Sequence, residues 1–428
     1  MTSLSTEETS FLAEAEKLFK KLDRIEKFEK KHQVMPFKEA EKTTKGLYKL
    51  TKKLPDIDAP KNENELFQAE LKRRLTGEAS HLDHRLSGEF YNFDKIISIY
   101  GIPKDDIIEL HSWLTLNREK TLEAIERLFK TSDIRHYDLG LLADIPRIRR
   151  EAESLAETTI RKYHMKLGKL LQNTKVGDYL RDIEAVPTNQ ERSYFDELMN
   201  TLAISIPAIV FVSEDGNIHI RDCELIRLYG HEGMGHGLNA VVTQSSNLPY
   251  FLKKGSATTI ATEESVSQFY ERVIFEHLKS SPETQKDLDI EHRFNDIYQQ
   301  FQDTRLLEDY KLKLIQYAIT VLADKTLRSS EEKAKKIAEV TLDPNWPKRF
   351  VDRNKLNYDF EGNLQPGLVS ELRYCVQPVK RALKTFQDQG IIYEGKGINI
   401  IDSVLLTGFW TPIGYVDNAR LKAEKIKR

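Results

Sequence analysis

Two histidines five residues apart, with a glutamate beside the first and glycines around both, constrain this chain more than any other feature. Residues 231–236 read HEGMGH. In the zinc-binding pattern HExxH the histidines are four residues apart, so both lie on one face of an α-helix. At about 100° per residue, an interval of five places them roughly 140° apart on a regular helix. A π-type turn with i→i+5 hydrogen bonds returns both rings to one side, and such turns are frequent at functional sites. The motif therefore predicts a metal-binding helix with a local π-type turn.

The glycines of this segment also indicate an unusual helix. Gly230, Gly233, Gly235 and Gly237 fall within eight residues of a chain that has 20 glycines. Each glycine costs up to about 1 kcal/mol in a helix interior. Their concentration indicates that the backbone here is adapted to the site at the expense of helix stability.

A third metal ligand is expected from the next predicted helix. A catalytic zinc ion takes three protein ligands and leaves one position to water. Residues 262–271 read TEESVSQFYE, which places Glu264 28 residues after His236. We expect Glu264 to be the third ligand, with Glu263 as the alternative. Glu271 lies two turns farther along the same face and could support a ligand histidine.

The predicted chemistry is hydrolysis. Zinc lowers the pKa of its bound water towards about 7, and Glu232 would take the proton as general base when the hydroxide attacks a carbonyl. A second interpretation makes Glu232 and His236 the ligands and leaves His231 outside. The same two residues could also form an ordinary helix-surface pair at i and i+4. The glycines, the preceding strands and the Glu263-Glu264 helix together favour a metal site.

Helical periodicity dominates the rest of the sequence. Helices are predicted over residues 6–32, 39–53, 65–75, 92–99, 105–116, 119–130, 146–172, 222 into the glycines, 262–279, 287–327, 330–341, 347–354 and 367–390. Residues 204–212 and 218–220 predict two short strands around an Asp-Gly turn. An edge strand beside the metal-binding helix would suit an extended peptide. We expect an N-terminal helical region, residues 1–190, and a catalytic region, residues 191–428, in one continuous body.

The composition indicates which classes of binding partner to expect. The formal net charge is −2 and the charged residues, 31% of the chain, alternate in sign, so no nucleic-acid or membrane partner is expected. No apolar run reaches the 18 residues or so of a membrane span, and the first residues lack the features of a signal peptide. Cys223 and Cys375 are expected to be free thiols in a cytoplasmic protein. The oligomeric state is left open.

The motifs resemble two groups of metallopeptidases. The first is the tyrosine-carboxypeptidase-like group acting on tubulin tails, with an expanded HExxxH helix followed by a Thr-Glu-Glu motif, as at 262–264. The second is the mainly bacterial, helical HExxPGH-type metallopeptidase/carboxypeptidase family. Its signatures HExxPGHxxQ, EGWALYxE and ExRYxxxPxQA are similar to residues 231–239, 264–271 and 371–378 here. The order of three motifs favours the second group, although this chain lacks the proline and has Asn239 in place of the glutamine.

The helical periodicity and the two short strands predict a mainly α fold with a small β element before the catalytic helix. The resemblance implies that this helix is gluzincin-like and lies within a large helical body. It also implies active-site roles for Arg373 and Tyr374. An arginine fork suits the terminal carboxylate of a peptide, and a tyrosine hydroxyl can donate to a developing oxyanion. The expected function is a zinc carboxypeptidase with a peptide substrate. The alternatives are an inactive helical peptide-binding protein with a decayed metal site, and a hydrolase of non-peptide amides.

Overall fold

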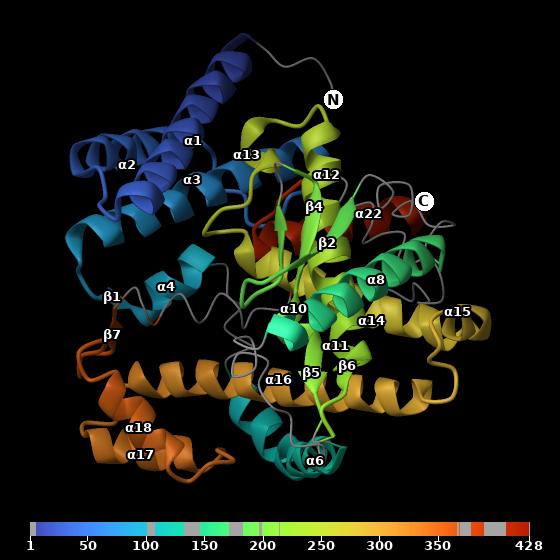
Figure 1. The fold of residues 1–428 in the computed structure, drawn as a ribbon. Coiled ribbons are helices and arrows are strands. Elements are labelled where there is room, and N and C mark those ends of the chain that lie inside the picture. Colours follow the sequence, from blue (N-terminus) through green and yellow to red (C-terminus); the bar gives the residue numbers. More distant parts are fainter. Residues whose placement is uncertain are drawn as a thin grey trace. The chain divides into compact units, whose positions relative to one another are not determined.

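The computed structural model describes residues 6–100, 108–131, 146–170, 183–196, 199–213, 215–365, 368, 378–388 and 408–427. Over these residues the chain is mainly helical with a few short strands, which confirms the predicted fold class (Figure 1). It divides into two compact units: unit 1 comprises residues 1–116, 246–265 and 312–428, and unit 2 comprises residues 117–245 and 266–311. The predicted boundary at residue 190 lies inside one segment of unit 2. The roles assigned to the regions on either side of it stay predictions.

In unit 1 the N-terminal helices pack against their neighbours in the sequence, and one of them also packs against the C-terminal helix. Helix α2 (Phe37–Thr51) packs against α1 (Thr6–His32) and α3 (Glu63–Ser87), and α3 also contacts α4 (Phe93–Tyr100) and α22 (Pro412–Lys427). Strand β1 (Tyr91–Asn92) pairs antiparallel with β7 (Asn363–Leu364). The other elements that belong wholly or partly to this unit are α6 (Leu110–Thr131), α13 (Tyr250–Lys253), α14 (Ile260–Lys279), α16 (Phe294–Leu322), α17 (Ser330–Ala338), α18 (Trp346–Arg353) and α20 (Pro378–Asp388).

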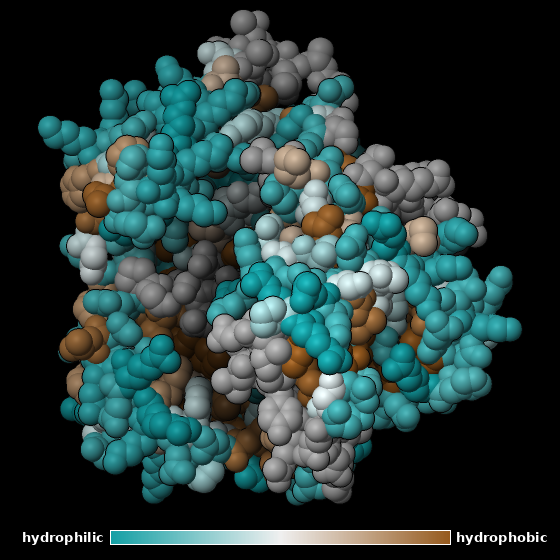
Figure 2. Space-filling view, in the orientation of Figure 1, coloured by the Kyte–Doolittle hydropathy of each residue, from teal (hydrophilic) through white to brown (hydrophobic). Residues whose placement is uncertain are grey.

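Amphipathic patterning explains the N-terminal helices. On α2, Ala40, Leu47 and Leu50 are fully buried, whereas the lysines of the same helix point to solvent. The surface over α1 and α2, at the upper left of Figure 2, is accordingly mostly hydrophilic. The lysines of α2 therefore form a solvated helix face. None of the described helices combines the length and the apolar character needed to cross a membrane.

Helix α3 (Glu63–Ser87) is longer than the helix over residues 65–75 that the sequence pattern predicted. It begins at Glu63 because the Asn62 side chain accepts a hydrogen bond from the main-chain N–H of Glu65, and it ends at Gly88, whose φ of 67° is left-handed. The prediction placed its end at residue 75, because the second half buries polar side chains that interrupt the apolar stripe.

These buried polar side chains on α3 attach two distant segments of unit 1. Glu70, Arg74 and Glu78 follow one another at intervals of four and are at most 3% exposed. Arg74 donates to two main-chain carbonyl oxygens, of residues 254 and 409. Glu78 accepts hydrogen bonds from the N–H and hydroxyl of Thr258, and Glu70 does the same with Thr411. The hydrogen bonds to residues 254 and 258 hold the segment that leads into α14.

Unit 2 contains a small mixed sheet. Strand β4 (Thr201–Ser205) lies between β2 (Glu184–Thr188), which is parallel to it, and β3 (Tyr194–Asp196), which is antiparallel. A separate hairpin joins β5 (Val210–Val212) to β6 (Ile218–Ile220) around the predicted Asp-Gly turn. The predicted strand 204–212 is interrupted by α10 (Ile206–Ile209), because Ser205 caps a helical turn with Pro207 in its first positions.

The hairpin leads directly into the helix of the motif. Helix α11 (Asp222–Leu228), the π-helix η1 (Tyr229–Gly237) and α12 (Leu238–Ser245) follow without a break. The helix begins at Asp222, as predicted, and the carboxylate of Asp222 binds the Tyr163 hydroxyl and the Arg293 guanidinium. Helix α8 (Pro146–Leu170), which carries Tyr163, also contacts β2, β6 and α15 (Pro282–Asp287).

A buried histidine gives unit 1 a predictable response to acid. His84 is 3% exposed and stacks on Tyr91, with ring centroids 3.9 Å apart. Burial lowers the pKa of His84 to about 4, whereas an unfolded histidine titrates near 6.5. Between these values the unfolded chain binds the proton and the folded protein does not, so stability falls as the pH falls. We expect His84 to cost up to about 2 kcal/mol between pH 7 and pH 5 in urea unfolding. His84→Phe should reduce this loss; an unchanged pH dependence would contradict the assignment.

Candidate metal centre

The HEGMGH segment lies on a π-helix, as its spacing predicted. Helix η1 spans Tyr229–Gly237, and the main-chain N–H of Leu238 bonds to the carbonyl oxygen of Gly233, five residues earlier. With five residues in the widened turn, His231 and His236 project from the same side of the helix. Their ring centroids are 5.2 Å apart and their planes are inclined at 72°.

The glycines of η1 serve close packing against its neighbours. A Cβ atom on Gly235 would lie 2.4 Å from the Cα of Ser267, and one on Gly230 would lie 2.9 Å from the Cα of Glu271. Both neighbours belong to helix α14, so the two helices approach nearly backbone to backbone. Gly233 and Gly237 admit Leu202 of β4 and the Phe195 ring of β3 in the same way. None of the four glycines has a positive φ, so their role is to remove a side chain, not to relax the backbone.

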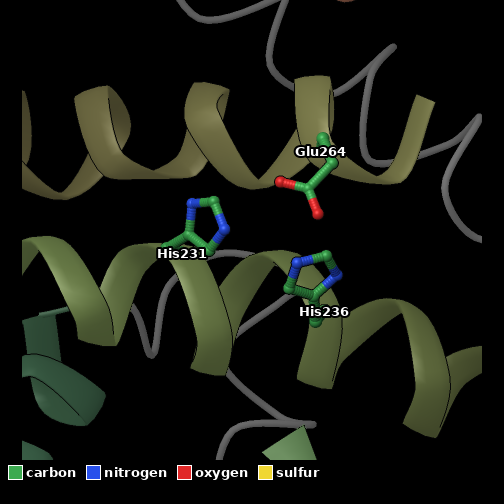
Figure 3. Close-up of side chains that lie close together, drawn as sticks. All are labelled: His231, His236 and Glu264. Atoms are coloured by element: carbon green, nitrogen blue, oxygen red, sulfur yellow. The ribbon is translucent and has the colours of Figure 1, made fainter. Parts of the chain in front are cut away.

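Three predicted ligands come together between η1 and α14. One ligand atom each from His231, His236 and Glu264 lies within 4.8 Å of the others, and all three residues are half-buried. Figure 3 shows both imidazoles and the Glu264 carboxylate facing one small space. Two nitrogen ligands and one oxygen ligand around a partly accessible position match the donor set of zinc peptidases. The same donor types hold Fe(II) in other enzymes, so the geometry alone does not select the metal.

Glu271 fixes the orientation of His231. Its Oε1 lies 2.6 Å from Nδ1 of His231. A carboxylate only accepts hydrogen bonds, so Nδ1 carries the proton and Nε2 is the nitrogen with which His231 would bind a metal. The predicted contact of Glu271 with one of the two histidines is therefore present, and the role of His231 as a metal ligand stays a prediction.

Glu271 is itself held in a buried ionic network. Its side chain is fully buried, Oε1 accepts a second hydrogen bond from Arg227, and Oε2 accepts one from Arg305, both at 3.3 Å. Burial raises the pKa of Glu271, but the hydrogen bond from His231 and the two arginine charges outweigh this effect and leave the pKa below its ordinary value. Glu271 is therefore a carboxylate anion whose two oxygens are both occupied.

The neighbouring acidic residues have different positions. Glu263, the alternative third ligand, accepts a hydrogen bond from the Thr259 hydroxyl and lies against Gly255, away from the ligand cluster. Glu232 is half-buried on η1, between the two histidines in sequence. The cluster joins His236 with His231 and Glu264 and does not include Glu232, which disfavours the interpretation with Glu232 as a ligand.

The structure does not test the two residues that the resemblance places in the active site. Arg373 and Tyr374 lie outside the described residues, so their predicted roles stay predictions. Tyr270 and Tyr310 are buried core aromatics. His219 is exposed on the β5–β6 hairpin, with Nε2 3.1 Å from the Ser213 hydroxyl.

Sequence reasoning missed the outer part of this centre. Arg227 and Arg305 are distant in sequence from the motif and from each other, and each appears as one of many arginines on a helix. Strands β2 and β3 were also missed, because β2 contains a proline and β3 has only three residues. A signal was present for Arg227: it lies four residues before His231, one helical turn away, and so near the same face.

Comparison with known proteins adds little to the geometry. No family model matches the chain, and no curated protein matches it. A solved structure, "the putative lipoprotein from Colwellia psychrerythraea", aligns with a TM-score of 0.45 and 12% identity, over 90% of this chain and 66% of that one. This chain thus spans just under two thirds of that protein's length. A likeness this distant carries no argument about the site.

The two adjacent glutamates of α14 give a matched test of the ligand set. We predict that Glu264→Gln weakens zinc binding by more than the roughly 10- to 100-fold that loss of an outer partner costs. Glu263→Gln should leave zinc affinity unchanged, because its carboxylate is turned towards Thr259. Competition titration against a chromophoric chelator measures both. The reverse order of effects would make Glu263 the ligand.

The close approach of η1 and α14 predicts the effect of a single methyl group. Gly235→Ala should cost about 2 kcal/mol of unfolding free energy in urea, because the new Cβ overlaps the main chain at Ser267. Gly168→Ala, on α8, is the control: its Cβ would contact only the Tyr229 hydroxyl at 4.0 Å, so it should stabilise by about 0.5–1 kcal/mol. If Gly235→Ala also stabilised the protein, the packing of the two helices described above would be wrong.

Proposed function

We propose that this chain is a zinc-dependent metallopeptidase in which His231, His236 and Glu264 hold the metal and Glu232 is the general base. The observation that carries the proposal is the convergence of the three ligands on one point, with Glu271 bonded to the far nitrogen of His231. A plain surface cluster of histidine and glutamate has no need of that buried carboxylate.

The donor set fits zinc. Two imidazoles and one carboxylate leave a coordination position for water, as in catalytic zinc sites. When bound, zinc would lower the pKa of a water molecule towards neutrality and polarise the scissile carbonyl. The half-buried position of the three ligands is compatible with access of water and substrate.

The chain's own residues supply the rest of the chemistry. Glu232 follows His231 directly on η1, and its carboxylate would accept the proton from the attacking water and pass it to the leaving amine. Glu271 keeps the His231 ring in one tautomer throughout. The anionic Glu271 would also offset part of the positive charge of a bound metal ion through His231.

A short strand beside the metal-binding helix supports a peptide as the substrate. Within the described part of the sheet, β3 is paired on one side only, with β4, and the Phe195 ring of β3 packs on Gly237 of η1. The open side of such a strand can receive an extended peptide through main-chain hydrogen bonds. Cleavage from the C-terminus rests on the resemblance of residues 371–378 to the carboxypeptidase family and is the finer part of the proposal.

Elemental analysis and one substitution test the proposal together. We predict about one zinc per wild-type chain and none in His236→Ala. Glu232→Gln should retain the zinc and lose roughly 10²- to 10⁴-fold in peptide hydrolysis, because it removes the base and leaves the ligands in place. Activity is measured on a mixed peptide library by mass spectrometry, which also distinguishes trimming from internal cleavage.

The other outcomes separate the alternatives. Zinc-loaded protein that binds peptides without cleaving them would indicate an inactive peptide-binding protein. Bound iron would redirect the search to redox chemistry. Hydrolysis that survives in Glu232→Gln would show that another group is the base.

A further inference from the structure

We infer that Arg305 of α16 is a positioning residue for the metal centre and acts through Glu271. The inference rests on the proposed metal site. It assigns a role in metal binding to a residue that lies 41 positions beyond the last ligand in the sequence and contacts no ligand directly.

Arg305 joins α16 to the supporting face of α14. Its Nη1 donates to Oε2 of Glu271 at 3.3 Å, and its Nη2 donates to Oε1 of Gln268 at 3.2 Å. The same guanidinium is fixed from its own helix by Glu308, at 2.9 Å, and Asp309, at 3.1 Å. The Arg305 side chain is only 7% exposed. Four acceptors on two helices thus determine where this guanidinium lies.

The contact with Glu271 has a specific consequence for His231. Arg305 occupies Oε2, and this leaves Oε1 turned towards Nδ1 of His231. A buried carboxylate that lost the donor on Oε2 would rotate or draw in water to replace it, because an unsatisfied buried charge is costly. Either change moves the acceptor that sets the His231 ring. Arg305 therefore fixes the ring through one intermediate side chain.

Arg227 does not do the same work. Its guanidinium is engaged in a bidentate pair with Glu224, at 2.8 and 2.9 Å. It reaches Glu271 at 3.3 Å, the same distance as Arg305, but on the oxygen that His231 already occupies. Arg227 adds positive charge beside Oε1, whereas Arg305 is the donor to Oε2. Loss of Arg305 is the change that frees the carboxylate to rotate.

A double-mutant cycle in the full-length chain tests the inference. The dissociation constant for zinc alone is measured by chelator competition for the wild type, Arg305→Met, Glu271→Gln and the double variant. We expect Glu271→Gln and Arg305→Met each to weaken zinc binding about tenfold or more. In the Glu271→Gln background, Arg305→Met should change the affinity little further, because Arg305 acts through Glu271. Two effects that simply multiply would overturn the inference.

The controls separate positioning from general stability. Arg272 lies next to Glu271 on α14; its side chain is 43% exposed and 3.6 Å from Asp309. Arg272→Met should leave the zinc affinity unchanged. The absorption spectrum of bound Co²⁺ is recorded for each variant. A shifted spectrum in Arg305→Met, beside an unshifted one in Arg272→Met, reports a changed ligand geometry that lower stability alone does not produce.

Two further outcomes complete the design. If Arg305→Met does not fold, Arg305→Lys replaces it, since a lysine keeps the charge but cannot hold acceptors on both helices with one planar fork. The Lys variant should bind zinc more weakly than the wild type, and wild-type affinity with an unshifted Co²⁺ spectrum would overturn the inference. A wild-type protein that binds no metal would refute the proposed function itself. A wild-type protein that binds zinc, with effects of the two substitutions that simply multiply, would overturn only the role of Arg305.

Discussion

The near contact of the η1 and α14 backbones is the constraint on which the rest of the site depends. A helix pair ordinarily keeps its axes 8–10 Å apart or so because side chains fill the space between them. Gly230 and Gly235 have no side chains to fill this space, so Glu271 and Ser267 pack directly against the backbone of η1. The short separation lets a glutamate of one helix reach an imidazole of the other at 2.6 Å. With longer separation, the same residues would need water between them.

This arrangement buries several charged side chains, and removing them from water costs free energy. Glu271 and Arg305 are nearly inaccessible, and Arg227 is only 17% exposed. Such networks rarely stabilise a fold more than apolar residues of the same shape would, and breaking one member costs several kcal/mol. Here the network lies behind His231, and it fixes the orientation of that ring without adding stability to the fold.

The sequence could predict the inner part of the site because that part is local. The interval from His231 to His236 required a π-type turn, and helical periodicity placed Glu264 and Glu271 on one face of a single helix. The mainly α fold followed from the same periodicity. The strands were harder to predict. β2 and β4 are neighbours in the sheet although β3 lies between them in the sequence, and three-residue strands such as β3 carry no periodic signal. Arg305 was out of reach for another reason. Its role depends on which helix packs behind α14, and that is a property of the tertiary structure that no local pattern encodes.

The widened turn of η1 also bears on how the length of a helix can vary. One extra residue in a regular α-helix rotates everything after it by about 100° and would turn all of α12 to a new face. In η1 the extra residue is absorbed within the turn between the two histidines, so the α-helical register on each side can be kept. The π-type turn therefore lets the two histidines stand five residues apart and still point to the same side of the helix. One residue more than in the HExxH pattern is thus accommodated between the histidines while both rings stay on one side of the helix.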